Sequence, residues 1–75
     1  MSEKMISTVM ELLDLNREEI ERNCKELPEI NAFYFWSSLR GGKSIIIKET
    51  EEKLVASSIV SLEEHIKAFI DGRRN

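Results

Sequence analysis

The sequence is short of the residues that build cross-links and membrane spans. It has one cysteine, Cys24, one proline and three glycines among its 75 residues. A single cysteine cannot form an intramolecular disulfide, which is typical of a protein from a reducing, intracellular compartment. No apolar run approaches the roughly 20 residues of a membrane-spanning helix. The N-terminus carries Glu3, Glu11 and Asp14 and lacks the composition of a signal peptide. These absences predict a soluble cytoplasmic protein.

Residue types that support catalysis or metal binding are also scarce. One histidine, His65, and one cysteine cannot form a zinc site by themselves. The carboxylates within residues 49–52 lack the alternation and the glycine of a calcium loop. His65 next to Glu64 has the residue types of a general base, but a position at the border of an amphipathic helix accounts for it better. We therefore predict that the chain is not an enzyme and has no catalytic, cofactor or metal site.

Basic residues are outnumbered by acidic ones, with 11 Lys and Arg against 14 Asp and Glu. The resulting net charge of −3 disfavours general binding to polyanions, because neutralising phosphates takes clustered Lys and Arg. Hydrophobic residues make up 41% of the chain and charged residues 33%, which is ordinary for a globular protein. The length predicts a single small domain over residues 1–75.

Three segments have the apolar spacing of amphipathic helices. Residues 3–14 begin after the potential N-cap Ser2, and residues 17–26 begin after Asn16, which starts a capping box. The second segment places Cys24 on its apolar stripe, as a small core residue, and Pro28 stops it. Residues 62–70 follow a capping box that starts at Ser61, and Gly72 is the expected C-cap glycine.

The middle of the chain reads as strands. Residues 30–38 are aromatic without helical spacing, residues 43–50 are β-branched at their centre, and residues 53–60 follow as the third strand. The segment LRGG at 39–42 predicts the first turn and residues 50–53 the second. The predicted fold is α+β, in the order ααβββα, with a three-stranded antiparallel meander packed against the helices.

Pairing the strands through these turns sorts the side chains into two faces. Trp36 would lie opposite Ile45, and Ile47 opposite Ala56, so that one nearly apolar face would pack against the helices. The other face would form an apolar patch with a polar rim, which is typical of a contact surface. Its apolar members are Phe33, Phe35, Ile46 and Val55. The alternative is that a helix covers this face too and the patch is ordinary core.

Residues 37–44, SSLRGGKS, differ from the phosphate-binding pattern GxxxxGKS by one missing glycine. A phosphate loop also requires a helix after the Lys-Ser pair, because the helix N-terminus holds the anion. Here Lys43 and Ser44 lead into a β-branched strand. The segment is better read as a turn with solvated Arg40 and Lys43.

The sequence therefore predicts a small, non-enzymatic, cytoplasmic protein-interaction domain. The partner would be another protein or a second copy of the chain, as in a homodimer that forms through a sheet face or edge. The apolar patch would supply the burial, and Arg40, Lys43 and Lys48 would steer an acidic partner. The alternative is weak binding of single-stranded nucleic acid through the same aromatic face and the basic hairpin tip. Neither a membrane nor a small-molecule substrate is inferred.

Overall fold

The computed structural model describes residues 2–37, 42–57 and 59–74, and every structural statement below refers to these residues. The sheet is antiparallel, with the strand order β1-β2-β3-β4. The predicted α+β class is confirmed, although the sheet has four strands where three were predicted. The elements are α1 (Glu3–Leu13), α2 (Arg17–Arg22), β1 (Cys24–Leu27), the 3₁₀ turn η1 (Pro28–Ile30), β2 (Ala32–Trp36), β3 (Lys43–Lys48), β4 (Lys53–Ser57) and α3 (Leu62–Ile70).

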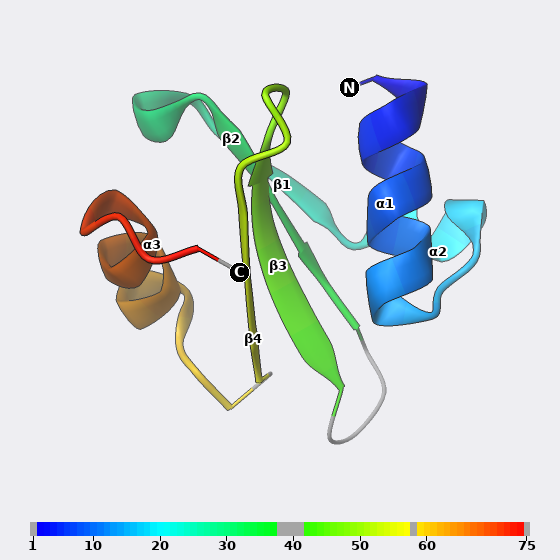
Figure 1. Cartoon of the computed structure of the whole chain (residues 1–75). Helices are drawn as coiled ribbons and strands as arrows, with labels where there is room; N and C mark the ends of the chain where they lie inside the picture. Colours follow the sequence, from blue (N-terminus) through cyan, green and yellow to red (C-terminus); the bar gives the residue numbers. More distant parts are fainter. Residues whose placement is uncertain (1, 38–41, 58, 75) are drawn as a thin grey trace.

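Helices cover both faces of the sheet, which produces three layers (Figure 1). On one face, α1 and α2 bury a cluster that includes Phe35, Ile45 and Ile47. On the other face, α3 buries a smaller cluster that joins its Phe69 to Ile46 and other sheet residues. The alternative that a helix covers the second face is thus confirmed, and neither face is left open.

The predicted helix starts are confirmed by their side-chain caps. Ser2 Oγ accepts a hydrogen bond from the Met5 amide at 3.1 Å, and Asn16 Oδ1 accepts one from the Glu19 amide at 2.9 Å. Ser61 Oγ accepts from the amide of residue 64 at 3.2 Å. Each cap satisfies one of the amide groups that the first turn of a helix leaves without a partner.

The second helix is shorter than predicted, because its last predicted turn is a strand. Helix α2 ends at Arg22, and the chain then pairs with β2, from Cys24 opposite Phe35 to Leu27 opposite Ala32. Backbone pairing at the sheet edge satisfies these amide and carbonyl groups and buries Leu27 to 3% exposure. Cys24 therefore lies on a strand, half-buried, and not on a helical stripe as predicted.

The predicted strand register is wrong at both hairpins. Trp36 pairs with Ser44 and not with Ile45, a shift of one residue. Strands β3 and β4 are joined by four residues, 49–52, where a two-residue loop was predicted, and Ile46 pairs with Leu54. A shift by an odd number of residues exchanges the faces of a strand. The side chains predicted to share the open face therefore do not all lie on one face of the sheet.

Strand β3 forms the centre of the molecule. Its four consecutive residues Ser44, Ile45, Ile46 and Ile47 each have 0% exposure, because β3 has a strand on each side and a helix over each face. No helix in the described part of the chain is long and apolar enough to cross a membrane.

Candidate functional site

The four apolar residues predicted as a contact patch lie on two different faces. Phe33, Phe35 and Val55 point toward α1, whereas Ile46 points toward α3. Phe35 and Ile46 have 0% exposure, and Phe33 and Val55 are half-buried against the first cluster. The prediction of one open face is corrected, because the register shift separates Ile46 from the others. Stacking of bases on Phe33 and Phe35 loses its geometric basis, because α1 covers both rings and Phe35 has 0% exposure.

The predicted basic residues do not form a cluster in the described structure. Arg40 lies outside the described residues. Lys43 is exposed at the start of β3, and Lys48 lies at its end, five residues or about 17 Å along the strand. The odd spacing also places these two lysines on opposite faces. Lys43 and Ser44 belong to strand β3, so no helix follows them and the segment is not a phosphate loop.

A buried hydrogen-bonded pair links α3 to the sheet, and sequence reasoning missed it. His65 Nε2 lies 2.7 Å from the carbonyl oxygen of Leu54, and His65 Nδ1 lies 3.3 Å from Ser44 Oγ. A carbonyl can only accept, so Nε2 carries the proton and the Ser44 hydroxyl donates to Nδ1. The Tyr34 ring stands edge-on to the imidazole, with a centroid separation of 5.9 Å.

This Ser–His pair is buried and links α3 to strands β3 and β4. Ser44 has 0% and His65 1% exposure, and both polar atoms of the imidazole are already engaged in hydrogen bonds within the fold. Burial lowers the pKa of His65, which keeps the imidazole neutral. The predicted register placed Ser44 on the wrong face, so the sequence contained no usable signal that the two residues meet.

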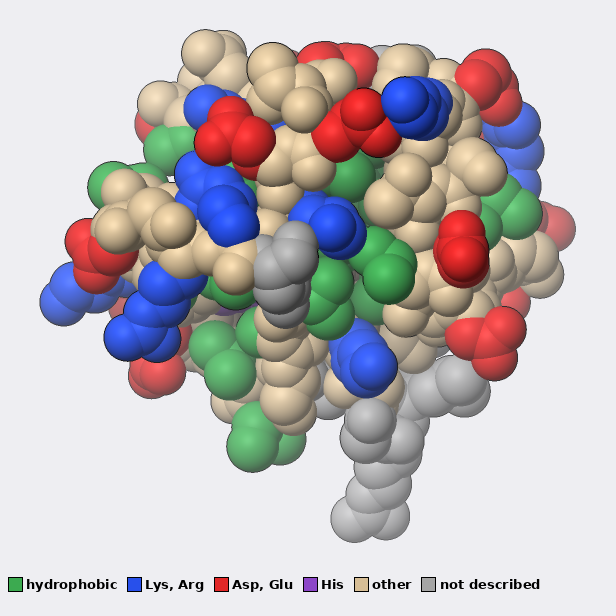
Figure 2. Space-filling model, viewed as in Figure 1, with side chains coloured by type: hydrophobic (Ala, Val, Ile, Leu, Met, Phe, Trp, Pro, Cys, Tyr) green, Lys and Arg blue, Asp and Glu red, His purple; other side chains and the backbone are tan. Residues whose placement is uncertain are grey.

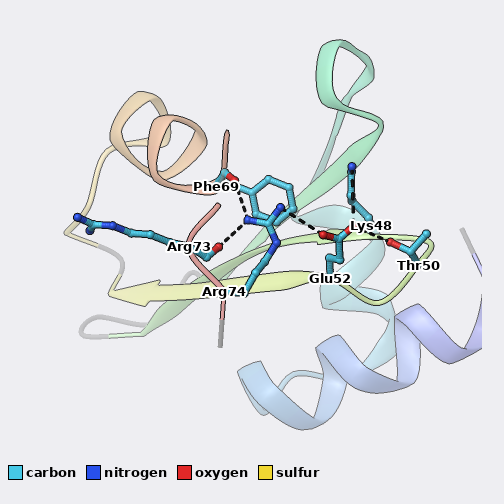
Figure 3. A network of polar contacts seen from close by, with 6 residues as sticks. All are labelled: Lys48, Thr50, Glu52, Phe69, Arg73 and Arg74. Carbon is cyan, nitrogen blue, oxygen red and sulfur yellow. Dashed lines mark hydrogen bonds and ion pairs between the residues drawn. The ribbon is translucent and has the colours of Figure 1, made fainter. Parts of the chain in front are cut away.

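A second polar network closes the C-terminal end of α3 (Figure 3). Arg74 Nη1 donates to the Phe69 carbonyl at 2.6 Å, and its guanidinium carbon lies 3.7 Å from the centroid of the Phe69 ring. Its Nη2 lies 3.5 Å from Glu52, which also approaches Lys48 Nζ at 4.0 Å. Gly72, with φ of 93°, turns the chain so that Arg74 can fold back. Because Glu52 lies beside both cations, this network ties the β3–β4 turn to α3 and is not an open anion site.

The outer edge of β1 is one of the two edges of the open sheet, the other being that of β4. The Trp36 amide donates to the Asn23 carbonyl at 3.3 Å. This bond determines which residues of β1 direct their backbone groups toward β2 and which direct them away. In an antiparallel ladder every second residue directs its N–H and C=O away from the paired strand. Those residues are Cys24 and Glu26, and their backbone groups have no partner among the described residues.

The side chains along this edge are polar and exposed. Lys25 and Glu26 are exposed, while Leu27 is buried under α3. Burial raises the pKa of the Cys24 thiol, so it stays protonated and is a poor nucleophile. The edge therefore offers hydrogen bonds and charge, with no reactive group.

The described residues contain no group of three or more His, Cys, Asp or Glu side chains that could hold a metal ion. A single copy thus presents no ready-made metal centre within residues 2–37, 42–57 and 59–74.

Comparisons with known proteins show one partial similarity. No family model matches the chain, and no solved structure matches it significantly. The chain is similar to a curated protein of Encephalitozoon cuniculi (strain GB-M1) described as "Probable divalent-cation tolerance protein cutA homolog". The two are 41% identical over 49 residues, which are 65% of this chain and 38% of that protein. The chain thus spans well under half the length of this relative.

Proposed function

We propose that the chain is a non-enzymatic protein-interaction domain that binds an extended strand of a partner at the outer edge of β1. The observation that carries this proposal is the open backbone edge at Cys24 and Glu26, beside a sheet whose two faces are covered. Strand addition is a common mode of peptide recognition, because main-chain hydrogen bonds supply affinity and side chains supply selectivity.

The charges on β1 restrict the partner. Two copies of β1 could pair with each other around a two-fold axis. Residues that lie opposite each other must then belong to the same face of the sheet. When the axis passes through the middle of β1, Lys25 therefore lies opposite Lys25, or Glu26 opposite Glu26. Like charges directly opposite each other destabilise a strand pair. A partner strand with an acid opposite Lys25 and a base opposite Glu26 fits this edge better.

A short peptide tests strand addition directly. We expect the peptide Thr-Val-Lys-Glu-Val-Thr to shift the Cys24 and Glu26 amide resonances in ¹H–¹⁵N spectra, with a Kd of about 1 mM from a few added hydrogen bonds. The matched peptide Thr-Val-Glu-Lys-Val-Thr, which places like charges opposite each other, should bind more weakly.

Two variants distinguish the contribution of the backbone to peptide binding from that of the side chain. Glu26→Ala and Glu26→Pro both remove the carboxylate. Only Glu26→Pro also removes the backbone N–H that points away from β2. Because that N–H does not bond to β2, the β1–β2 hydrogen bonds stay intact. The Glu26→Pro variant should therefore bind the peptide about fivefold more weakly than the Glu26→Ala variant. Equal binding by the two variants, or no shift in the wild-type chain, would contradict the proposal.

A second candidate function is a role in divalent-cation tolerance. The similarity to the microsporidian protein over 49 residues favours it. Since the described residues hold no metal cluster, the chain would act through its partner and not as a chelator by itself.

Growth measurements test this role. Cells that express the chain should grow at higher concentrations of Zn²⁺, Cu²⁺ or Mn²⁺ salts than cells with an empty vector. The Glu26→Pro variant should lose this advantage if the β1 edge mediates it, whereas Glu26→Ala should keep most of it. Identical growth with and without the wild-type chain would rule this candidate out.

A further inference from the structure

A groove runs between β4 and α3, on the opposite edge of the sheet from β1. It encloses a cavity of about 300 Å³, and its apolar lining includes Leu54, Ala56, Val60 and Ala68. Ala68 is half-buried and carries the smallest side chain on this flank of α3, so another element could approach the helix closely here. The groove is an apolar recess bordered by charged residues.

The charges at the two ends of the groove are opposite in sign. Glu64 lies in the first turn of α3 and Arg73 lies just after the helix, and both are exposed. The chain turns back at Gly72, and the Arg73 amide donates to the Ala68 carbonyl at 3.1 Å, which holds Arg73 against the last turn of α3. Neither side chain has a charged partner among the described residues. Figure 3 shows that the Arg73 side chain points away from Arg74, which contacts Arg73 only at its carbonyl.

A large apolar side chain lies next to this recess. Ile59 is 89% exposed, and it immediately precedes Val60, which lines the groove. Figure 2 shows apolar side chains at the surface where the segment after β4 leads into α3. Ile59 and the apolar lining of the groove thus form one continuous apolar surface with charged residues at its border.

We propose that a second copy of this chain binds at the groove as a symmetric dimer. A two-fold axis near Ala68 would pack the two α3 helices antiparallel. Glu64 would then face Arg73 of the partner subunit, and Arg73 would face Glu64 of the partner subunit. Ile59 of each copy would enter the groove of the other. The opposite charges of Glu64 and Arg73 make the surface self-complementary in charge, which a two-fold interface requires.

This dimer goes beyond the strand binding proposed above and uses the other edge of the molecule. Glu26→Pro should leave the dimer intact, and changes in the groove should leave the peptide shifts at Cys24 and Glu26 intact. Failure of one proposal is therefore distinguishable from failure of the other.

Sedimentation equilibrium of the full chain over a wide concentration range tests the dimer. We expect the wild type to dimerise and Ile59→Asp to weaken the dimer at least about tenfold, because a carboxylate would be buried in an apolar site. Ile70→Asp is the matched control: Ile70 is also exposed, at 62%, but does not line the groove. A monomeric wild type, or a dimer equally sensitive to both changes, would overturn the proposal.

A charge exchange tests the symmetry. Glu64→Arg and Arg73→Glu should each weaken the dimer about tenfold, since each creates two like-charge contacts across the axis. The double variant Glu64→Arg with Arg73→Glu should restore the wild-type Kd. A double variant that dimerises no better than the single ones would contradict the antiparallel arrangement.

Discussion

Replacing Phe35 by alanine should lower the free energy of unfolding by about 3–5 kcal/mol, as large-to-small changes in a well-packed core do. The ring has 0% exposure and packs among α1, α2 and β3 residues, so the change would leave a cavity. A 75-residue domain has a total stability of about 4–11 kcal/mol, so much of the margin would be lost. Urea unfolding followed by circular dichroism measures the effect.

Phe33→Ala is the matched control for this prediction. Phe33 lies on the same strand and the same face, but it is only half-buried, so the same truncation should cost less. A Phe35→Ala variant as stable as the wild type would mean that the ring does not belong to the core, and the original prediction of a contact residue would regain its basis.

Replacing His65 by alanine should lower the free energy of unfolding by about 2–4 kcal/mol. The change removes a side chain with 1% exposure and leaves the Ser44 hydroxyl without its buried partner. The Leu54 carbonyl also loses its bond to the ring. Chemical denaturation at pH 7.5 measures this, and His65→Gln should lose less because its amide can still donate to a carbonyl.

The same histidine should make stability depend on pH. Burial lowers its pKa in the folded chain below the ordinary value of 6.5, so the unfolded chain binds the proton more tightly. Its contribution is fully present above pH 6.5 and is lost as the pH falls from there through the lowered pKa. The wild type should therefore lose more stability than His65→Gln between pH 7.5 and 5. Parallel pH profiles for the two proteins would contradict this assignment.

The sequence predicted the helical elements well where local chemistry decides the structure. The caps at Ser2, Asn16 and Ser61 depend on residues within one turn of each helix, and all three are present. Strand β1 was missed because residues 17–26 continue a helical pattern. Pairing with β2, which follows directly after the turn at residues 28–31, overrides that helical pattern and makes Cys24–Leu27 a strand.

The candidate sites were harder to predict, because they depend on register. Strands β3 and β4 are joined by four residues and not by the predicted two. Glu51 has a positive φ of 73° in this connection, and because the residue is not a glycine the sequence does not signal this turn. The error exchanged the faces and hid the contact between Ser44 and His65. The open edge at β1 could not be proposed without β1 itself.

The burial of β3 from both sides also bears on how this chain can evolve. Most globular strands have a solvent side on which substitutions are nearly neutral, but residues 44–47 have no such side. Each substitution there must fit the buried layer that its own side chain faces, α1 and α2 for Ile45 and Ile47 or α3 for Ile46. New binding properties can therefore be acquired most readily at the rim of the sheet, where a change on one edge leaves the central strand and the opposite edge undisturbed.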